Sequence, residues 1–440
     1  MPNDRFRRTP VVVTGVGAVS VAGLGADRLW TAVLDRRVLT GPVSRFDLSR
    51  YPTQRAGQVP DDALAALEHR VPPHGSRAAR YLAAAVREAL ADAGLADGGQ
   101  VGGGQVGGGQ VGGGQVGGGQ VDRGQADRGP VAAAGVVGLY VGSVMATRPT
   151  LDAGIGPAGL AVPGRLWATP ARLLDPVREV VGRPGPAVLL ASGCSVGNGA
   201  IAAGHRAVLA GEVDVAVCAG VEELSLEIFA MFTALRALAP DLVRPFDADR
   251  RGTMPAEGAG VLILERADRC AARGGRPRAT VLACASAADA HHMTQPHPEG
   301  AALAATLQAV LDAARIEPDE LDWVCAHGTG TPANDGVEAR ATAKVLTGRR
   351  RPPVSSVKGQ LGHAAGAAAA LEAVLAVCAL TDDAIPGNVN LRSPDPACDG
   401  LDLVPAEGRR QPVSVVASPA YGFGGGVTTL LLGKGDRGAD

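Results

Sequence analysis

The stretch AVLLASGCSVGNGAIAAGHRAVLAGEVDVAVCAG, residues 187–220, decides the fold class of this chain. Its first run, AVLLAS, predicts a strand, and the small residues at Gly197–Leu209 predict a tightly packed helix. A cysteine flanked by small residues lies in the loop between them, and VDVAVCAG predicts a second buried strand. This order of elements is typical of α/β proteins, in which functional residues gather where strands end.

The same alternation continues in both directions along the chain. VVVTGVGAVS from Val11 predicts a buried strand, VVGLYVGS at Val136–Ser143 another, and SRAARYLAAAVREALADAGL a helix that stops near Gly94. Farther on, LDWVCAHGTGT predicts a strand that ends in a polar loop, and GAAAALEAVLAVCAL predicts a helix. The stretches around Cys194 and His327 both run from strand to loop to helix. This is compatible with two similar halves, although periodicity alone does not prove a duplication.

Length and composition limit the classes of function. At 440 residues the chain exceeds one ordinary core, and 46% hydrophobic with 20% charged residues suits a well-buried globular protein. A net charge of −2 gives no reason to expect nucleic acid or a membrane surface as a partner, and no apolar run predicts a membrane span. The seven cysteines are scattered, so neither a metal site nor a disulfide framework is expected. With a polar N-terminus, the chain is expected to be cytoplasmic.

One segment departs from globular composition. QVGGG repeats four times from Gln100 to Gly119, inside a tract rich in Gly and Gln at 98–130. Glycine at this density cannot support a core, so we expect a flexible surface insertion. A role as a spacer or in contacting a partner is the alternative.

Cys194 is the first candidate for chemistry. It precedes the small-residue helix, where unsatisfied N–H groups and the helix dipole stabilise a thiolate and predict a lowered pKa. A packed, inert thiol is the alternative, and it is the interpretation that fits the other six cysteines.

Histidines in two loops bear on whether Cys194 is a nucleophile or an inert thiol. His327 opens HGTGTPANDGVEA after a predicted strand, and SSVKGQLGHAAG contains Lys358 and, five residues later, His363. The loop YGFGGG, Tyr421–Gly426, adds backbone N–H groups that could bind a thioester oxyanion. A cysteine and two histidines beside such a loop suit acyl transfer through a thioester intermediate.

Taken in order, these motifs resemble those of the thiolase-superfamily β-ketoacyl synthases, the condensing enzymes of fatty acid and polyketide synthesis. The resemblance covers nearly the whole chain and rests on VVVTGVGAVS, GCSVGNGAIAAGHRAVLAGEVDVAVCAGVE, RPFDADRRGTMPAEGAGVLILE, DAHHMTQPHPEG, AHGTGTPANDGVEA, SSVKGQLGHAAGAAAALEAV, IPGNVNLRSPDP and YGFGGG. It implies an α/β protein with the thiolase-like five-layered αβαβα fold. Residues 1–265 would form the half that carries the nucleophile, and residues 266–440 the half that carries the two histidines.

The resemblance also implies a role for each matched residue. Cys194 resembles the acyl-accepting nucleophile. His327 and His363 resemble the pair that binds the malonyl thioester and promotes its decarboxylation. Lys358 resembles the lysine that organises them electrostatically, with a carboxylate such as Glu338. The remaining implied assignments are the oxyanion hole and gate at Cys194, Phe423, Gly422, Gly424 and Gly425, the pantetheine-binding Thr329 and Thr331, and a carrier-protein rim at Arg77, Arg80 and Arg206.

The implied activity is the decarboxylative Claisen condensation of a β-ketoacyl-[acyl carrier protein] synthase in a bacterial type II polyketide or fatty acid pathway. Its substrates arrive on the 4′-phosphopantetheine of acyl carrier protein, and no metal or enzyme-bound cofactor is implied. The partners would be the carrier protein and a second ketosynthase-like chain, as a homodimer or a heterodimer. Two other interpretations stay open: an acyltransferase that uses the same site without decarboxylation, and a non-catalytic chain-length partner, in which the nucleophile is commonly replaced by glutamine.

Three motifs depart from the family pattern. CSVGN stands where relatives have a run rich in serine or threonine, and GFGGGV lacks the usual threonine and asparagine after GFGG. RRGTMPAEGAG replaces the more usual RDGFVMGEGAG. These changes leave the predicted catalytic set intact, and they bear on substrate size and partner choice.

Overall fold

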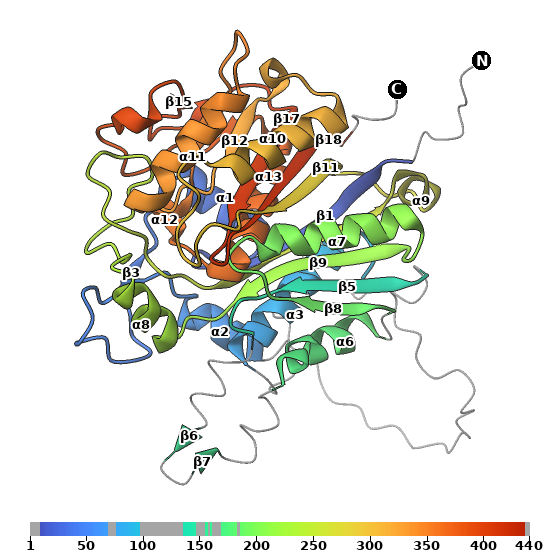
Figure 1. Ribbon diagram of the computed structural model, residues 1–440. Coiled ribbons are helices and arrows are strands. Elements are labelled where there is room, and N and C mark those ends of the chain that lie inside the picture. Colours follow the sequence, from blue (N-terminus) through green and yellow to red (C-terminus); the bar gives the residue numbers. More distant parts are fainter. Residues whose placement is uncertain are drawn as a thin grey trace, which may run out of the picture.

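The computed structural model describes residues 9–68, 76–96, 135–146, 155–156, 159–160, 169–182 and 185–435 (Figure 1). The predicted insertion at 98–130 lies outside the described residues, so its flexibility and its alternative role stay predictions.

A large mixed sheet runs through the molecule, and its strands form two halves with the same topology. The first half has the order β8 (Ala187–Leu190), β5 (Val137–Gly142), β9 (Val215–Glu222), β10 (Gly258–Arg266) and β1 (Val11–Ser20). The second has the order β13 (Pro353–Ser355), β12 (Trp323–Cys325), β17 (Val415–Tyr421), β18 (Gly426–Lys434) and β11 (Ala279–Ala288), with β15 (Asp402–Leu403) outside β13. In each half the first three strands are parallel and the last two pairings are antiparallel.

The two halves meet at a short junction. Val11–Val13 of β1 pairs antiparallel with Ala279–Val281 of β11. The repeated strand order confirms the expectation of two similar halves, and the boundary at 265/266 stays a prediction.

Helices supply three further layers, so that the architecture is αβαβα. They are α3 (Arg77–Asp92) and α6 (Asp175–Val181) outside the first half, α7 (Val196–Ala210) and α13 (Ala368–Asp382) between the halves, and α10 (Ala301–Ala314) and α11 (Pro332–Val345) outside the second (Figure 1). Strand β9 shows why both sheet faces are apolar: Val215 and Val217 pack toward α3, while Ala216 and Cys218 pack toward the middle layer.

Smaller elements complete the described fold. The helices are α1 (Ala26–Leu34), α2 (Asp61–Glu68), α8 (Leu226–Ala234), α9 (Ala267–Ala272) and α12 (Lys358–Leu361), with 3₁₀ turns at Pro170–Leu174, Pro318–Glu320, Ala365–Ala367 and Pro396–Cys398. The short strands are β2 (Gly23–Leu24), β3 (Gly41–Pro42), β4 (Arg55–Ala56), β6 (Ile155–Gly156), β7 (Gly159–Leu160), β14 (Ala384–Ile385) and β16 (Arg409–Arg410).

The glycines of β1 allow α3 to approach the sheet closely. A Cβ at Gly15 would lie 2.1 Å from the carbonyl oxygen of Ala89, and one at Gly17 would lie 2.0 Å from that of Ala85. Ser76 caps this helix by accepting the Ala79 N–H. Gly15 and Gly17 are therefore required for the close packing of α3 on β1.

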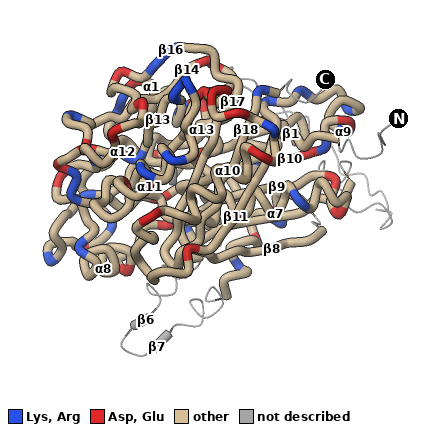
Figure 2. The backbone as a smooth tube through the Cα atoms, turned by 45° about the horizontal axis from the view of Figure 1, so that its top comes forward, with Lys and Arg blue, Asp and Glu red and all other residues tan. Residues whose placement is uncertain are grey.

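Charged residues of both signs lie mostly around the periphery, and the central strands are mostly neutral (Figure 2). Among the described residues, one helical run, Ala365–Asp382, is long and apolar enough to cross a membrane, and 89% of it is buried inside the protein. It contains α13, the packed helix of the middle layer.

Candidate active site

One cavity brings together the predicted site residues of both halves. Cys194 comes from the start of α7, and His327 and His363 come from the loops after β12 and α12. Thr329, Thr331 and residues of the loop after β17 also line the cavity. Functional groups more than 200 residues apart in sequence therefore converge where the two halves meet.

Cys194 is held against the glycine loop. The preceding Gly193 has φ 74°, and a Cβ there would lie 2.5 Å from the carbonyl oxygen of Phe423. A Cβ at Gly422 would lie 2.8 Å from the backbone nitrogen of Cys194. Only glycine fits at these two contacts. As a result, the backbone N–H groups of Phe423 and of Cys194 itself lie close enough to the thiol to lower its pKa. Their role as an oxyanion hole stays a prediction.

The expected lowering of the Cys194 pKa is wrong for this structure. Burial raises the pKa of the thiol to about 12, and the carboxylate of Glu222 adds to the increase. Lys358 and the two N–H groups act in the opposite direction, but they do not offset the loss of water around a side chain only 8% exposed. The free protein therefore holds Cys194 as a neutral thiol at neutral pH.

The two imidazoles are neutral and close together. Their ring centroids are 5.3 Å apart, and the ring planes of His327 and His363 are perpendicular. Burial lowers the pKa of each well below its usual value, and the positive charge of Lys358 lowers both further. A neutral imidazole offers one N–H donor, which suits binding of a carbonyl oxygen.

Lys358 has a different carboxylate partner from the one expected. Its ammonium group pairs with Glu372 on α13, not with Glu338. Glu338 instead accepts the backbone N–H groups of His327 at 2.6 Å and Gly328 at 2.7 Å. Burial raises the pKa of Glu338 to about 7, and the charge of Lys358 opposes that rise. Glu338 therefore fixes the backbone of the histidine loop, and Glu372 holds the lysine.

The two predicted pantetheine hydroxyls form a pair. The Oγ1 atoms of Thr329 and Thr331 are 2.9 Å apart, and Thr331 caps α11 by accepting the Asn334 N–H. Asp335 accepts the N–H of Gly330 between them at 3.1 Å. The hydroxyls are thereby held at the cavity wall.

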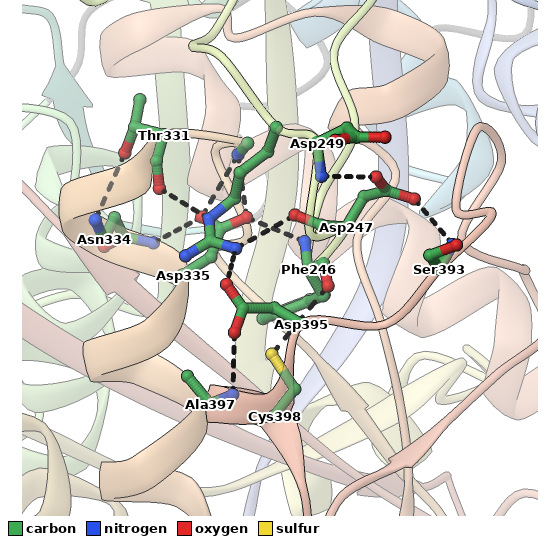
Figure 3. A network of polar contacts seen from close by, with 12 residues as sticks. Phe246, Asp247, Asp249, Thr331, Asn334, Asp335, Ser393, Asp395, Ala397 and Cys398 are labelled. Carbon is green, nitrogen blue, oxygen red and sulfur yellow. Dashed lines mark hydrogen bonds and ion pairs between the residues drawn. The ribbon is translucent and has the colours of Figure 1, made fainter.

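A wider polar network supports this threonine pair (Figure 3). Arg250 donates to the backbone oxygen of Thr331 at 3.2 Å and pairs with Asp395. Asp335 reaches the same region from α11 and accepts the N–H of Phe246 at 2.9 Å. The segment around 246–250 and the loop near 395 thus brace the threonine loop from behind.

The predicted gate contacts two neighbouring segments. The ring of Phe423 lies 5.8 Å from that of Phe232 on α8. The Gly424 N–H donates to the Met293 carbonyl at 2.7 Å, and the Gly425 carbonyl accepts from the Asp289 N–H at 2.7 Å. The glycine loop is therefore tied to the loop that follows β11.

The three arginines predicted for a carrier-protein rim lie away from the cavity lining. Arg77 at the start of α3 and Arg206 on α7 are exposed, and Arg80 is half-buried. Their role stays a prediction. Within the described part of the chain, no three His, Cys, Asp or Glu side chains are placed to hold a metal ion.

Two buried carboxylates beside the candidate catalytic residues were not among the residues predicted from the sequence. Glu372 is the single acid in the apolar run AAAALEAVLAVCAL, and Glu222 ends the apolar strand β9. Glu222 accepts N–H groups of Val144 at 2.9 Å and Gly366 at 3.1 Å, and burial raises its pKa to about 7. A lone acid within an apolar run was the signal that could have identified Glu372, and an acid at the end of a buried strand was the signal for Glu222.

Comparison with known proteins gives one consistent result. The family model described as "Beta-ketoacyl synthase, N-terminal domain" matches residues 8–162 and 176–269, and "Beta-ketoacyl synthase, C-terminal domain" matches residues 278–392. The chain is 33% identical to "Putative polyketide beta-ketoacyl synthase 1" of Streptomyces halstedii, covering 97% of this chain and 98% of that one. It is 31% identical to "3-oxoacyl-[acyl-carrier-protein] synthase 2" of Synechocystis, covering 96% and 98%.

A solved structure agrees with these relatives. "The ishigamide ketosynthase/chain length factor" superposes with a TM-score of 0.83 at 31% identity, covering 97% of this chain and 99% of that one. The matched models, the relatives and the structure all extend over both halves of the fold, including the segments that supply Cys194 and the two histidines. The chain therefore belongs to the β-ketoacyl synthases, enzymes of the thiolase fold that transfer acyl groups.

Proposed function

We propose that this chain is itself a catalytic β-ketoacyl-[acyl carrier protein] synthase of a bacterial type II polyketide or fatty acid pathway, located in the cytoplasm. One observation carries the proposal: the Cys194 thiol faces two backbone N–H groups and shares a cavity with two neutral imidazoles. A chain that only sets product length needs neither a nucleophile nor this pair of donors.

The first half-reaction loads Cys194. Its sulfur attacks the thioester of an acyl carrier protein, a new C–S bond forms, and the bond to the pantetheine sulfur breaks. The proton of Cys194 ends on the departing pantetheine thiol. The N–H groups of Cys194 and Phe423 stabilise the oxyanion of the tetrahedral intermediate. Thr329 and Thr331 would hold the pantetheine arm.

The second half-reaction forms the carbon–carbon bond. His327 and His363 donate to the thioester carbonyl of a malonyl carrier protein, and the bond to its carboxylate breaks. Carbon dioxide leaves, and the electron pair forms an enolate that the two donors stabilise. The enolate carbon attacks the acyl group on Cys194, whose C–S bond then breaks. The sulfur leaves with the electron pair and regains its proton from solvent when the product departs. Buried walls keep out the water that would protonate the enolate.

A second copy, or a ketosynthase-like chain, is the proposed partner at β8. Among the described strands, β8 pairs only with β5, so its other edge is free. The C-terminal end of β8 leads directly into the loop that carries Cys194. Val188 on this strand is 38% exposed, and Val136 nearby is 46% exposed. An apolar, unpaired edge is suited to pairing with another strand.

Acyl carrier protein is the second proposed partner. It would meet the cavity near the exposed lining residue Leu235, whose neighbour Arg236 is also exposed. Arg251, two residues before the buried Thr253, is exposed as well. Basic residues there would attract an acidic carrier. Arg77, Arg80 and Arg206 would serve only as a more distant part of that rim.

Intact-mass measurement after incubation with acyl and malonyl carrier proteins tests the proposal. We expect an acyl adduct on the wild-type protein, none on Cys194→Ala, and a β-ketoacyl carrier product. An adduct without condensation would favour an acyltransferase. No adduct, alone or with a ketosynthase-like partner, would leave the chain-length role.

A further inference from the structure

Four side chains that line the cavity have a buried polar atom without a hydrogen-bond partner among the described residues. They are His327, His363, Thr253 and Tyr421. Buried polar groups in proteins are nearly always partnered, so an unpartnered one in an enzyme cavity points to a partner that arrives with the substrate. The two imidazoles already have a role in condensation. The hydroxyls of Thr253 and Tyr421 do not.

Thr253 occupies a fixed place between two parts of the site. It is fully buried, and its neighbours are held through their backbones. Gly252 donates to the carbonyl of Gly330, in the loop of the paired threonines, at 3.0 Å. Met254 accepts the N–H of His363 at 2.8 Å. The threonine side chain therefore lies on a braced segment between the expected pantetheine path and a catalytic imidazole.

The extender substrate has a polar group that the other residues leave unbound. A malonyl thioester carries a thioester carbonyl and, at the other end of a three-carbon unit, a free carboxylate. The imidazoles account for the carbonyl. No Lys or Arg is among the described residues that line the cavity, so the donor to the carboxylate must be neutral. Tyr421 is less suited because the negative charges of Glu338 and Asp289, which raise the pKa of its hydroxyl, would also repel a further carboxylate there.

We propose that the Thr253 hydroxyl donates a hydrogen bond to the free carboxylate of the malonyl-type extender and thereby orients it. The inference rests on the proposed condensation and adds a specificity-determining residue to it. A neutral donor orients the carboxylate but stabilises its charge less than a cation would, which leaves the carbon–carbon bond free to break. In RRGTMPAEGAG, Thr253 stands where the resembled pattern RDGFVMGEGAG has phenylalanine.

Two substitutions separate the hydroxyl from the volume of the side chain. Thr253→Val keeps the shape and removes the donor, whereas Thr253→Ser keeps the donor. In the complete enzyme with Cys194 already acylated, we expect Thr253→Val to raise the KM for malonyl carrier protein about tenfold. Thr253→Ser should stay within about threefold of the wild type, as one retained donor implies. The rate of Cys194 loading from an acyl carrier protein, which involves no carboxylate, is the reference reaction.

Three results would overturn the inference: an unchanged KM in Thr253→Val, equal losses in both variants, or a parallel loss of loading. A wild-type protein that loads but does not condense would contradict the proposed function instead. Direct binding then still tests the hydroxyl, by comparing malonyl with acetyl carrier protein. Thr253→Val should weaken binding of the malonyl form alone, and equal affinities for both forms in wild type and variant would exclude the contact.

Discussion

The ammonium group of Lys358 pairs with the carboxylate of Glu372 in a place where neither is in contact with solvent. Lys358 is 1% exposed and Glu372 is 2% exposed. Burial raises the pKa of Glu372, and the lysine opposes that rise. Glu372 holds the ammonium group of Lys358 beside the two imidazoles, where its positive charge helps to keep them neutral.

Breaking this pair should be costly. Glu372→Gln leaves an uncompensated buried ammonium, and we expect a loss of about 3–5 kcal/mol in the free energy of unfolding. The matched control is the double variant Lys358→Met/Glu372→Leu, which removes both charges and should recover most of that stability without recovering condensation. Denaturant unfolding and product formation measure the two effects. Equal stability of Glu372→Gln and wild type would contradict the buried pairing.

The thiol of Cys194 should react slowly in the free protein. Because burial raises its pKa to about 12, alkylation by iodoacetamide should be slower than that of free cysteine at pH 8 and should still be rising at pH 10. Mass spectrometry of the labelled peptide gives the rate, with Cys194→Ser as the blank. A rate that reaches its plateau near pH 8 would show that the thiolate is stabilised after all.

Glu222 should make stability depend on pH. Its pKa is about 7 in the folded protein and about 4.5 when unfolded, so between these values the folded state retains a proton that the unfolded state releases. Stability from this group is therefore fully present below pH 4.5 and is lost as the pH rises to 7, by on the order of 3 kcal/mol.

Comparison with Glu222→Gln isolates this effect from those of the two histidines. The depressed histidine pKa values act in the opposite direction, since protonation of the unfolded state costs stability below pH 6.5. The wild type and Glu222→Gln share the contribution of the two histidines, so it cancels when they are compared. The difference between the unfolding free energies of variant and wild type should grow from pH 4.5 to 7 and then level off. A difference independent of pH would refute the raised pKa.

Gly193 and Gly199 form a matched pair of substitutions around the start of α7. Gly193→Ala places a methyl group 2.5 Å from the Phe423 carbonyl at φ 74°, so it should displace the oxyanion hole and abolish loading of Cys194. Gly199→Ala meets no atom within 4 Å and should stabilise the helix by about 0.5–1 kcal/mol with loading intact. Intact-mass measurement of Cys194 loading and thermal unfolding of each variant distinguish the two substitutions. An active Gly193→Ala protein would show that the close approach is not required.

Several parts of the site could be predicted from sequence because local pattern determines them. Glycine and small residues mark the loop at Cys194 and the helix α7, which begins at Val196, one residue earlier than predicted. His327 and His363 were recognisable because each lies in a polar loop beside apolar elements. The expected two halves appear in the strand order.

Other parts depend on tertiary packing. The partner of Lys358 is a carboxylate fourteen residues farther along, in a helix that the sequence shows only as apolar. The pKa of Cys194 was predicted with the wrong sign because helix position is local, whereas loss of solvent depends on every neighbouring layer. The unpartnered hydroxyl of Thr253 likewise becomes visible only when the cavity is formed.

The middle layer also bears on how the chain folds during synthesis. Helix α13, which covers the inner faces of β10 and β17, is encoded at Ala368–Asp382, long after the strands of the first half. A nascent chain that has emerged only as far as β10 already has α7 on this sheet face but still lacks α13, so part of the apolar face has no cover. Such surfaces favour aggregation and binding by chaperones until the missing element arrives. Production of this protein should therefore depend on late steps of synthesis, and fragments that end before α13 should accumulate as insoluble material.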